Sequence, residues 1–176
     1  DGIRDKLVTG VQTCALPIWL WNGLPADVRG ATGFLYSRGR VGDSIARGEH
    51  LGIGGSFKPG IAGRLILFND AVGRDMLVGQ TPLGLRAWHH VVLVRQGSRV
   101  RVHLDGHPEP DLAGSLPLTL PDGQHPLFLG GRSDGLFHFE GKLDEIAIYP
   151  RALDASEIAG HFKTAGIRPA PGVSSP

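Results

Sequence analysis

The sequence predicts an all-β fold, a two-sheet antiparallel sandwich of the jelly-roll type with one short C-terminal helix. Three observations predict it. Short apolar stretches recur between turn residues, and the 176 residues include 27 glycines and 13 prolines. Apolar residues do not follow a helical period until the last part of the chain. Residues 88–105 have the pattern of a β-hairpin.

The hairpin at residues 88–105 is the clearest element. Its first arm, WHHVVLVR, is rich in valine, QGS at 96–98 forms the turn, and RVRVHLD alternates strictly. Because side chains alternate between the faces of a strand, the second arm has one face for the core, made of Val100, Val102 and Leu104. The opposite face carries Arg99, Arg101 and His103. The first arm is apolar at every position from 91 to 94, which predicts a strand covered on both sides.

Further strands are predicted at 33–38, 51–54, 64–68, 76–78, 127–129 and 142–149. Each is a short apolar or alternating stretch that ends in Gly, Pro, Asn or Asp. No predicted helix separates them, which favours an antiparallel sandwich or barrel over βαβ units. A domain over residues 19–165 is long enough to bury on the order of two-thirds of its unfolded surface.

One helix is predicted at residues 155–164. Asp154 is the expected N-cap, Glu157 completes a capping box, and Gly166 supplies the C-terminal stop. A helix this short needs packing to be stable in water, so we expect it to lie on the sandwich. The apolar residues expected to hold it there are Leu153, Ile158 and Phe162.

The ends of the chain are excluded from the predicted domain. Residues 1–18 show neither a helical period nor strand alternation, and they resemble the translated read-through of a sequencing-library adapter in environmental DNA. The domain is therefore expected to lack part of its N-terminal edge and to come from a longer parent chain. Residues 166–176 are rich in Pro and Ser and are predicted to form a disordered tail.

Composition excludes several classes of partner. Eighteen Lys and Arg against 17 Asp and Glu give a net charge of +1, so no net field attracts nucleic acid or an anionic membrane. Membrane insertion is not expected, because no apolar run approaches the roughly 18 residues of a membrane span. Cys14 is the single cysteine, which excludes an internal disulfide and a Cys-based zinc site.

Three stretches, in this order, resemble laminin G-like jelly-roll domains. They are WHHV at 88–91 followed by VHLDG at 102–106, GKLDEIAIY at 141–149, and RAL at 151–153 running into EI at 157–158. This family belongs to the concanavalin A-like lectin and glucanase group, and the resemblance covers residues 19–165. It implies a two-sheet jelly roll that is often an accessory module of secreted or cell-surface proteins, frequently bacterial. Members bind glycans or proteins, sometimes with calcium.

Two groups of residues are candidates for ligand binding. Trp19 and Trp21 could stack on a sugar, and we expect at most one of them to face the interior while the other is free for a ligand. Arg99, Arg101 and His103 could hold an acidic glycan from one face of the hairpin. The alternative is that this charged stripe is only a solvated surface.

Calcium is the cofactor that the resemblance implies. Asp144, beside Glu145, lies in a predicted strand of a fold that often carries calcium at its rim, and hard cations take several oxygen ligands. Asn69, Asp70 and Asp134 could add oxygens from loops. The alternative for Asp144 is a capped or hydrogen-bonded carboxylate.

The sequence contains no recognisable catalytic constellation. EGKLDE at 140–145 lacks the E-x-D-x-x-E spacing that glucanases of this fold carry on one strand, and neither a G-x-S-x-G elbow nor a P-loop occurs. The prediction is a non-catalytic, carbohydrate-binding module of a longer exported bacterial protein, secreted or on the cell surface. Its expected partners are a glycan or a surface protein and the other domains of the parent chain. A protein-adhesion module or a structural spacer is the alternative, and a glycoside hydrolase is the least favoured.

Overall fold

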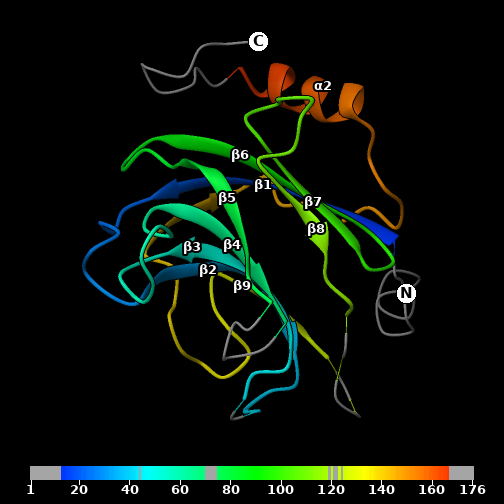
Figure 1. Cartoon of the computed structure of the whole chain (residues 1–176). Coiled ribbons are helices and arrows are strands. Elements are labelled where there is room, and N and C mark those ends of the chain that lie inside the picture. The colour runs from blue at the N-terminus through cyan, green and yellow to red at the C-terminus, as the bar shows by residue number, and fades with distance from the viewer. Residues whose placement is uncertain are drawn as a thin grey trace.

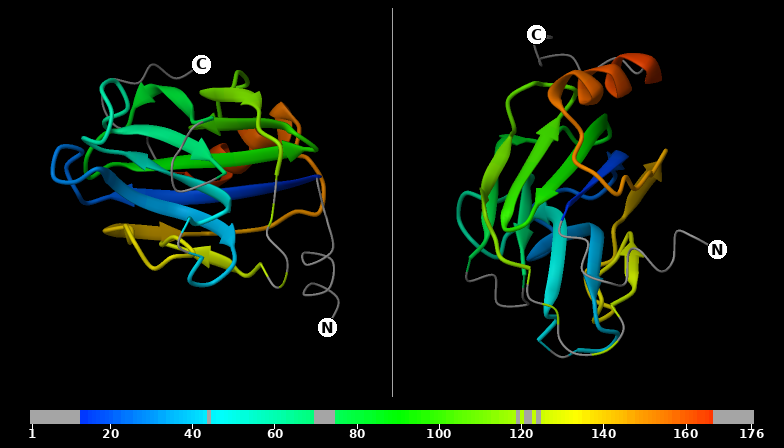
Figure 2. Two further views of the ribbon diagram at one scale, coloured as in Figure 1. Left: turned by 60° about the horizontal axis from the view of Figure 1, so that its bottom comes forward. Right: turned by 90° about the vertical axis from the view of Figure 1, so that its right-hand side faces the viewer.

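The computed structural model describes residues 13–43, 45–69, 75–118, 120, 123 and 125–166. These residues form two five-stranded antiparallel sheets and helix α2 (Ala155–Ala165). The sheets lie face to face, and α2 lies against one of them on the side away from the other (Figures 1 and 2). The predicted all-β jelly-roll sandwich with one short C-terminal helix is confirmed.

Both sheets join strands that are distant in the sequence. The first sheet has the order β10 (Gly141–Asp144), β1 (Thr13–Asn22), β6 (Trp88–Gln96), β7 (Arg99–Leu104) and β8 (Leu112–Ser115). The second has the order β5 (Leu77–Pro82), β4 (Arg64–Phe68), β3 (Gly48–Gly54), β2 (Ala31–Gly39) and β9 (Leu127–Leu129). The strands predicted at 64–68 and 127–129 have the observed bounds, and those predicted at 33–38 and 51–54 are longer by a few residues.

The core between the sheets is apolar because alternate residues of each strand point inward. The hairpin of β6 and β7 follows the prediction, since Val100, Val102 and Leu104 are buried in this core and Arg99 is exposed. Gly97 has a φ of 60°, as a two-residue hairpin turn requires. Other members of the core are Ile18, Leu20, Leu35, Leu51, Ile53, Leu65, Leu67, Val91 and Leu93.

Strand β1 begins before the boundary that the sequence predicts. Residues 13–18 pair with β6 over their whole length, and Ala15 exchanges backbone hydrogen bonds of 3.1 and 2.9 Å with Tyr149 on the other side. Ala15 and Ile18 are fully buried. The structure therefore corrects the boundary at residue 19, because ALPIWLW at 15–21 is an apolar run of the kind that a strand covered on both faces shows. Residues 1–12 and 167–176 lie outside the described residues, and the adapter-like origin of the first segment stays a prediction.

The strand predicted at 142–149 is wrong in its second half. β10 ends at Asp144, because Glu145 adopts a left-handed φ of 47° that departs from extended geometry. Beyond it, the Ala147 amide donates to the carbonyl oxygen of Pro17 at 3.3 Å, and Tyr149 forms an isolated bridge with Ala15 of β1. One backbone conformation thus divides the predicted strand into a short strand and a bridge.

Helix α2 has the predicted ends. The Asp154 carboxylate accepts the Glu157 amide at 2.9 Å, and the Glu157 carboxylate accepts the Asp154 amide at 3.0 Å, which completes the capping box. Gly166 is left-handed at the C-cap, with a φ of 64°. Within the described part of the chain, no helix has both the length and the apolar content that crossing a membrane requires.

The same helix packs on the outer face of the first sheet. Leu153 and Ile158 are buried against Val92 and Val94 of β6. Phe162 is half-buried, and its ring stacks on Trp19 of β1 with centroids 5.7 Å apart. The prediction that Leu153, Ile158 and Phe162 hold the helix on the sandwich is confirmed.

A buried ion pair joins the two sheets through the interior. Arg95 of β6 and Glu49 of β3 each have side chains only 1% exposed, and Nε of Arg95 donates to Oε2 of Glu49 at 2.6 Å. Nη1 of Arg95 also donates to the carbonyl oxygens of Gly97 and Leu116, at 2.8 and 2.9 Å. The Tyr36 hydroxyl donates to Oε1 of Glu49 at 3.2 Å. Both charges are thus paired and hydrogen-bonded, as burial of a charge requires.

The environment of this pair keeps its neighbours protonated. Burial first, and then the negative charge of Glu49, raise the pKa of the Tyr36 hydroxyl well above its usual value. The same two causes, in the same order, raise the pKa of the Cys14 thiol to about 11. Near neutral pH neither Tyr36 nor Cys14 therefore adds a negative charge beside the Glu49–Arg95 pair.

Candidate functional site

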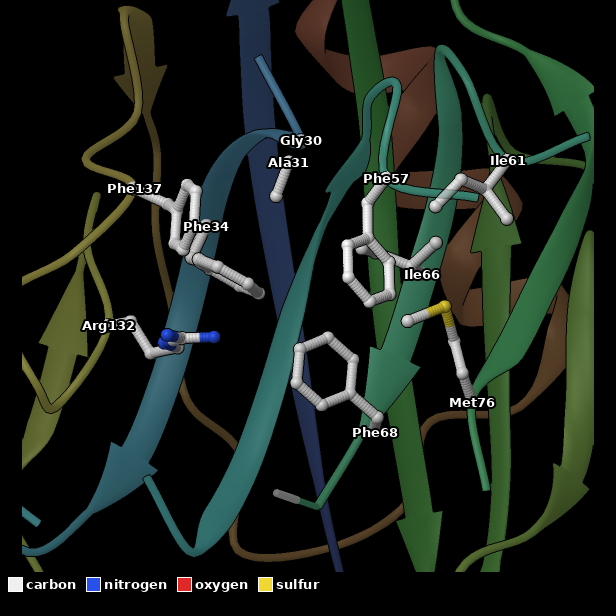
Figure 3. Close-up of a pocket in the computed structure, with 10 residues that line it drawn as sticks. All are labelled: Gly30, Ala31, Phe34, Phe57, Ile61, Ile66, Phe68, Met76, Arg132 and Phe137. Carbon is white, nitrogen blue, oxygen red and sulfur yellow. The ribbon is translucent and has the colours of Figure 1, made fainter. Parts of the chain in front are cut away.

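The outer face of the second sheet carries a pocket of about 110 Å³ (Figure 3). Three buried side chains point away from the sandwich core: Phe34 of β2, and Ile66 and Phe68 of β4. These side chains form the floor of a concave apolar surface that no helix of the described residues covers. We call it the aromatic pocket, and it is lined by Gly30, Ala31, Phe34, Phe57, Ile61, Ile66, Phe68, Met76, Arg132 and Phe137.

One wall of the aromatic pocket comes from the loop after β3. The amides of Gly55 and Phe57 both donate to the carbonyl oxygen of Gly30, each at 3.1 Å, which holds this loop against the start of β2. Position 55 requires glycine, because a Cβ there would lie 2.0 Å from the carbonyl oxygen of Arg29. The Phe57 ring consequently stands at the rim of the pocket and is 70% exposed.

The opposite wall comes from the segment after β9. The Phe34 amide donates to the carbonyl oxygen of Phe137 at 3.2 Å, so this segment lies along β2. A Cβ at Gly33 would come within 2.7 Å of the Cα of Phe139, so only glycine allows the close approach. Phe137 itself has a left-handed φ of 53°. Bulky residues rarely adopt that conformation, and such outliers concentrate at binding sites and active sites.

Aromatic rings and one arginine meet in the pocket. Phe34 makes edge-on contacts with Phe68 and Phe137, with centroids 5.7 and 6.3 Å apart. Cζ of Arg132 lies 5.2 Å from the Phe34 ring centre and 5.1 Å from that of Phe137, within cation–π distance. Arg132 is held by Asp134, whose carboxylate accepts its Nε at 2.9 Å and its Nη2 at 2.6 Å. This bidentate pair fixes the orientation of the guanidinium group.

The charge of Arg132 is balanced within the site. Burial would raise the pKa of the Asp134 carboxyl, but the hydrogen bonds from Arg132 and from the Leu136 amide lower it below its usual value. Asp134 therefore stays ionised beside the guanidinium. Arg132 is the single charged residue among those that line the pocket, and no Asp, Glu, His, Ser or Cys is among them. The pocket can hold and orient a ligand, but its lining offers no acid, base or nucleophile.

The two candidate tryptophans, Trp19 and Trp21, have different surroundings. They share the outer face of β1, because residues two apart in a strand point the same way, so neither points into the core between the sheets. Trp19 is only 3% exposed, enclosed by His90, at 4.9 Å between ring centres, and by Phe162. Trp21 is partly exposed, and the Lys142 ammonium lies 5.2 Å from its ring centre. Of the two, only Trp21 is accessible to a ligand.

The charged face of the hairpin borders a groove of about 510 Å³ next to the start of α2. Arg101 and His103 line it, and Arg101 also lines, together with Arg99, a second depression between β7 and β8. Arg101 donates to Gln96 at 2.9 Å. His103 is buried, which lowers its pKa, and its Nδ1 donates to the carbonyl oxygen of His107 at 3.1 Å. Arg101 and His103 thus each have a partner within the protein, and ligand binding by Arg99, Arg101 and His103 stays a prediction.

The candidate calcium ligands do not come together in the described residues. Asp134 accepts three hydrogen bonds from Arg132 and Leu136, and Asp144, on β10 of the other sheet, accepts the Glu145 amide at 2.8 Å. Asn69 donates to the carbonyl oxygen of Pro117, and its Oδ1 is buried with no partner there. Asp70 lies outside the described residues. The described part of the chain holds no group of three or more His, Cys, Asp or Glu suited to a metal ion, so calcium binding stays a prediction.

Sequence analysis did not identify the aromatic pocket. One signal was present: RLILF at 64–68 is apolar at consecutive positions, so Ile66 and Phe68 must be buried on the face opposite Leu65 and Leu67. No predicted helix was available to cover that face. The contribution of Phe57 carries no such signal, because it depends on how the loop after β3 folds back.

A family model of the laminin G type, described as the concanavalin A-like lectin/glucanases superfamily, matches residues 37–159. The match covers most of the chain and includes strands of both sheets and the start of α2. The chain therefore belongs to this superfamily, as a laminin G-like domain. No curated protein is similar to it in sequence at a significant level.

Solved structures with a similar fold come from proteins of several kinds. Domain 4 of AbnA, an extracellular GH43 arabinanase from Geobacillus stearothermophilus solved with arabinotriose, is 16% identical with a TM-score of 0.61, over 85% of this chain and 66% of that one. A SAP-like pentraxin from Limulus polyphemus is 17% identical with a TM-score of 0.58, over 93% and 76%. A mutant of Trypanosoma rangeli sialidase that displays trans-sialidase activity is 21% identical with a TM-score of 0.64, over 89% and 23%. The chain thus spans just under two-thirds of the arabinanase domain and less than a quarter of the sialidase, and at these identities the likeness is one of fold.

Proposed function

We propose that this chain is a non-catalytic module that binds carbohydrate through the aromatic pocket. The observation that carries the proposal is the pocket itself, in which an exposed Phe57 ring stands over an apolar floor with Arg132 at one side. Ligand sites are typically concave and mostly apolar, with a few polar groups that fix orientation. Sugar rings have apolar C–H faces that pack on aromatic rings. Membership of a lectin-containing superfamily, and the arabinanase domain solved with arabinotriose, support a sugar as the ligand.

The chemistry of the lining favours binding over hydrolysis. Glycoside hydrolysis requires a pair of carboxyl groups on either side of the bond that is cut. The aromatic pocket has no carboxylate in its lining, and the nearby Asp134 is engaged by Arg132. A hydrolase built on this pocket would have no acid to protonate the leaving group and no base to activate water.

The proposed module acts outside the cell and as part of a longer protein. The arabinanase that supplies one structural relative is extracellular, which supports this location. The sialidase relative extends well beyond the part that the chain matches, which supports a role as one unit among others. Such a module would hold its parent protein on a polysaccharide or a surface glycan.

Substitution of Phe57 tests the proposal. Phe57→Ala is expected to weaken glycan binding tenfold or more, since burying a Phe side chain contributes about 1.5–3 kcal/mol and each 1.4 kcal/mol is about a factor of ten. The melting temperature should change little, because the ring is 70% exposed in the free protein. A glycan array followed by calorimetric titration of the best ligand measures both the ligand class and the loss.

Two control variants locate the effect. Val41→Ala removes a side chain that is 66% exposed and does not line the pocket, so it should bind glycan as the wild type does. Arg101→Ala alters the groove beside α2 and should also leave binding unchanged. Loss of glycan binding in Arg101→Ala but not in Phe57→Ala would show that the glycan binds in the groove and not in the aromatic pocket. If no glycan on the array binds, the proposal is wrong, and protein adhesion or a spacer role takes its place.

A further inference from the structure

The size of the aromatic pocket limits what can enter it. A cavity of about 150 Å³ holds one benzene ring, whereas the aromatic pocket measures about 110 Å³. A pyranose ring with its hydroxyl groups is bulkier than benzene. The pocket therefore has room for a substituent of a sugar and not for the ring, which must remain at the rim beside the exposed Phe57.

The lining limits the chemistry of that substituent. Apart from Arg132, every side chain that lines the pocket is apolar, and none of them is a strong hydrogen-bond acceptor. A hydroxyl group that enters finds no acceptor for its proton among these side chains, and burial of an unpaired polar group costs about 1–3 kcal/mol. The part of the substituent that reaches the floor of Phe34 and Phe68 must therefore be apolar.

Arg132 supplies the one hydrogen-bond donor. Its Nε and Nη2 are taken by Asp134, whereas Nη1 has no hydrogen-bond partner among the described residues. Figure 3 shows the guanidinium group directed toward the interior of the pocket beside Phe34. The substituent must therefore offer an acceptor near its apolar end, within reach of this donor.

The balance of charge favours a neutral acceptor. Asp134 already compensates the charge of Arg132, at 2.6 Å between the nearest atoms. An anionic sugar would lose its hydration on entering and would meet no net positive charge in return. A carbonyl oxygen has a smaller cost of desolvation and accepts one hydrogen bond without a counter-ion.

We propose, on the basis of the carbohydrate-binding function above, that the aromatic pocket recognises the acetyl group of an acetylated glycan. The acetyl methyl group packs on the apolar floor that Phe34 and Phe68 form, and the carbonyl oxygen accepts a hydrogen bond from Nη1 of Arg132. The sugar ring to which the acetyl group is attached lies at the rim, against Phe57. The pocket thereby distinguishes an acetylated sugar from the same sugar with a free hydroxyl group.

Matched pairs of neutral oligosaccharides test this specificity. Partly O-acetylated xylo-oligosaccharides are compared with the same sample after saponification, and chitotriose is compared with cellotriose, which has hydroxyl groups in place of the acetamido groups. The acetylated member of at least one pair is expected to bind tenfold more tightly. In saturation-transfer NMR, the acetyl methyl protons of the bound ligand should receive the largest share of the saturation, because they lie among the aromatic rings.

A pocket-filling variant supplies the specific control. Ala31→Leu adds three carbons to a residue that lines the pocket and is partly exposed, and it leaves Phe57 in place for the sugar ring. It should reduce the preference for the acetylated member to near one while binding of the deacetylated member persists. Circular dichroism and the melting temperature verify that this variant is folded, and Ala31→Val, which adds two carbons at the same position, replaces it with the same expected result if it is not.

The outcomes separate this inference from the proposed function. Equal binding of both members of each pair overturns acetyl recognition and leaves carbohydrate binding intact. Tighter binding of trigalacturonate than of either acetylated ligand also overturns it, because the preferred substituent is then an anion. Failure of every oligosaccharide to bind overturns both proposals.

Discussion

Deletion of residues 1–18 is expected to lower the melting temperature by about 10 °C or more, or to prevent folding. Strand β1 lies between β6 and β10, so the deletion removes the first half of an interior strand. Ile18 is fully buried in the core, and loss of one such side chain costs about 3 kcal/mol. In a domain of this size each 1 kcal/mol shifts the melting temperature by about 2–4 °C.

The measurement is calorimetric unfolding of the whole chain and two truncated forms. Deletion of residues 1–12 alone, for which the sequence predicts no helix or strand, is the matched control and should change the melting temperature by no more than a degree or two. A shift this small for the longer deletion would show that residues 13–18 do not pack as the structure has them. It would also favour the interpretation that the whole segment is foreign to the domain.

The second large effect is expected from Glu49→Leu. This change leaves the Arg95 guanidinium buried without a counter-charge, and breaking a buried pair on one side costs about 3–5 kcal/mol. Arg95→Met should cost a similar amount, because Glu49 then lacks its partner and the carbonyl oxygens of Gly97 and Leu116 lose their donor. Urea-induced unfolding of both variants measures the free-energy changes.

The double variant Glu49→Leu with Arg95→Met completes a mutant cycle. It buries no unpaired charge, so it should be less destabilised than the sum of the single variants by at least about 2 kcal/mol. Exact additivity of the two changes, or single losses below about 1 kcal/mol, would mean that the two charges are not paired in the interior. The pair would then be a surface contact, for which such small values are typical.

Much of the fold follows from local patterns in the sequence. The alternation of Val100, Val102 and Leu104 determines which face of β7 is buried, and the capping box of Asp154 and Glu157 fixes the start of α2. The errors fall where the local pattern is ambiguous or absent. The start of β1 was missed because its apolar run does not alternate. The strand predicted at 142–149 ends early because a single residue, Glu145, is left-handed.

The candidate site was less predictable than the fold, because it depends on contacts between distant segments. Phe34, Phe57, Phe68 and Phe137 come from four separate parts of the chain, and their convergence depends on strand register and on two loops. From the sequence alone, each of these phenylalanines is typical of an ordinary core residue. The charged residues that were a second candidate from the sequence, Arg101 and His103, border a groove in which Arg101 binds the Gln96 side chain and His103 binds a backbone carbonyl oxygen.

Chemical-shift mapping by NMR can locate the sugar-binding surface on the wild-type protein. The ¹⁵N-labelled protein is titrated with the tightest oligosaccharide from the array, and the shifts of the backbone amides are followed. If the sugar binds in the aromatic pocket, the largest changes are expected at Phe34, Phe57, Arg132 and Phe137, with the amides of the groove beside α2 unchanged. Changes confined to Arg101 and its neighbours in that groove, with the amides of the pocket unperturbed, would contradict binding in the aromatic pocket.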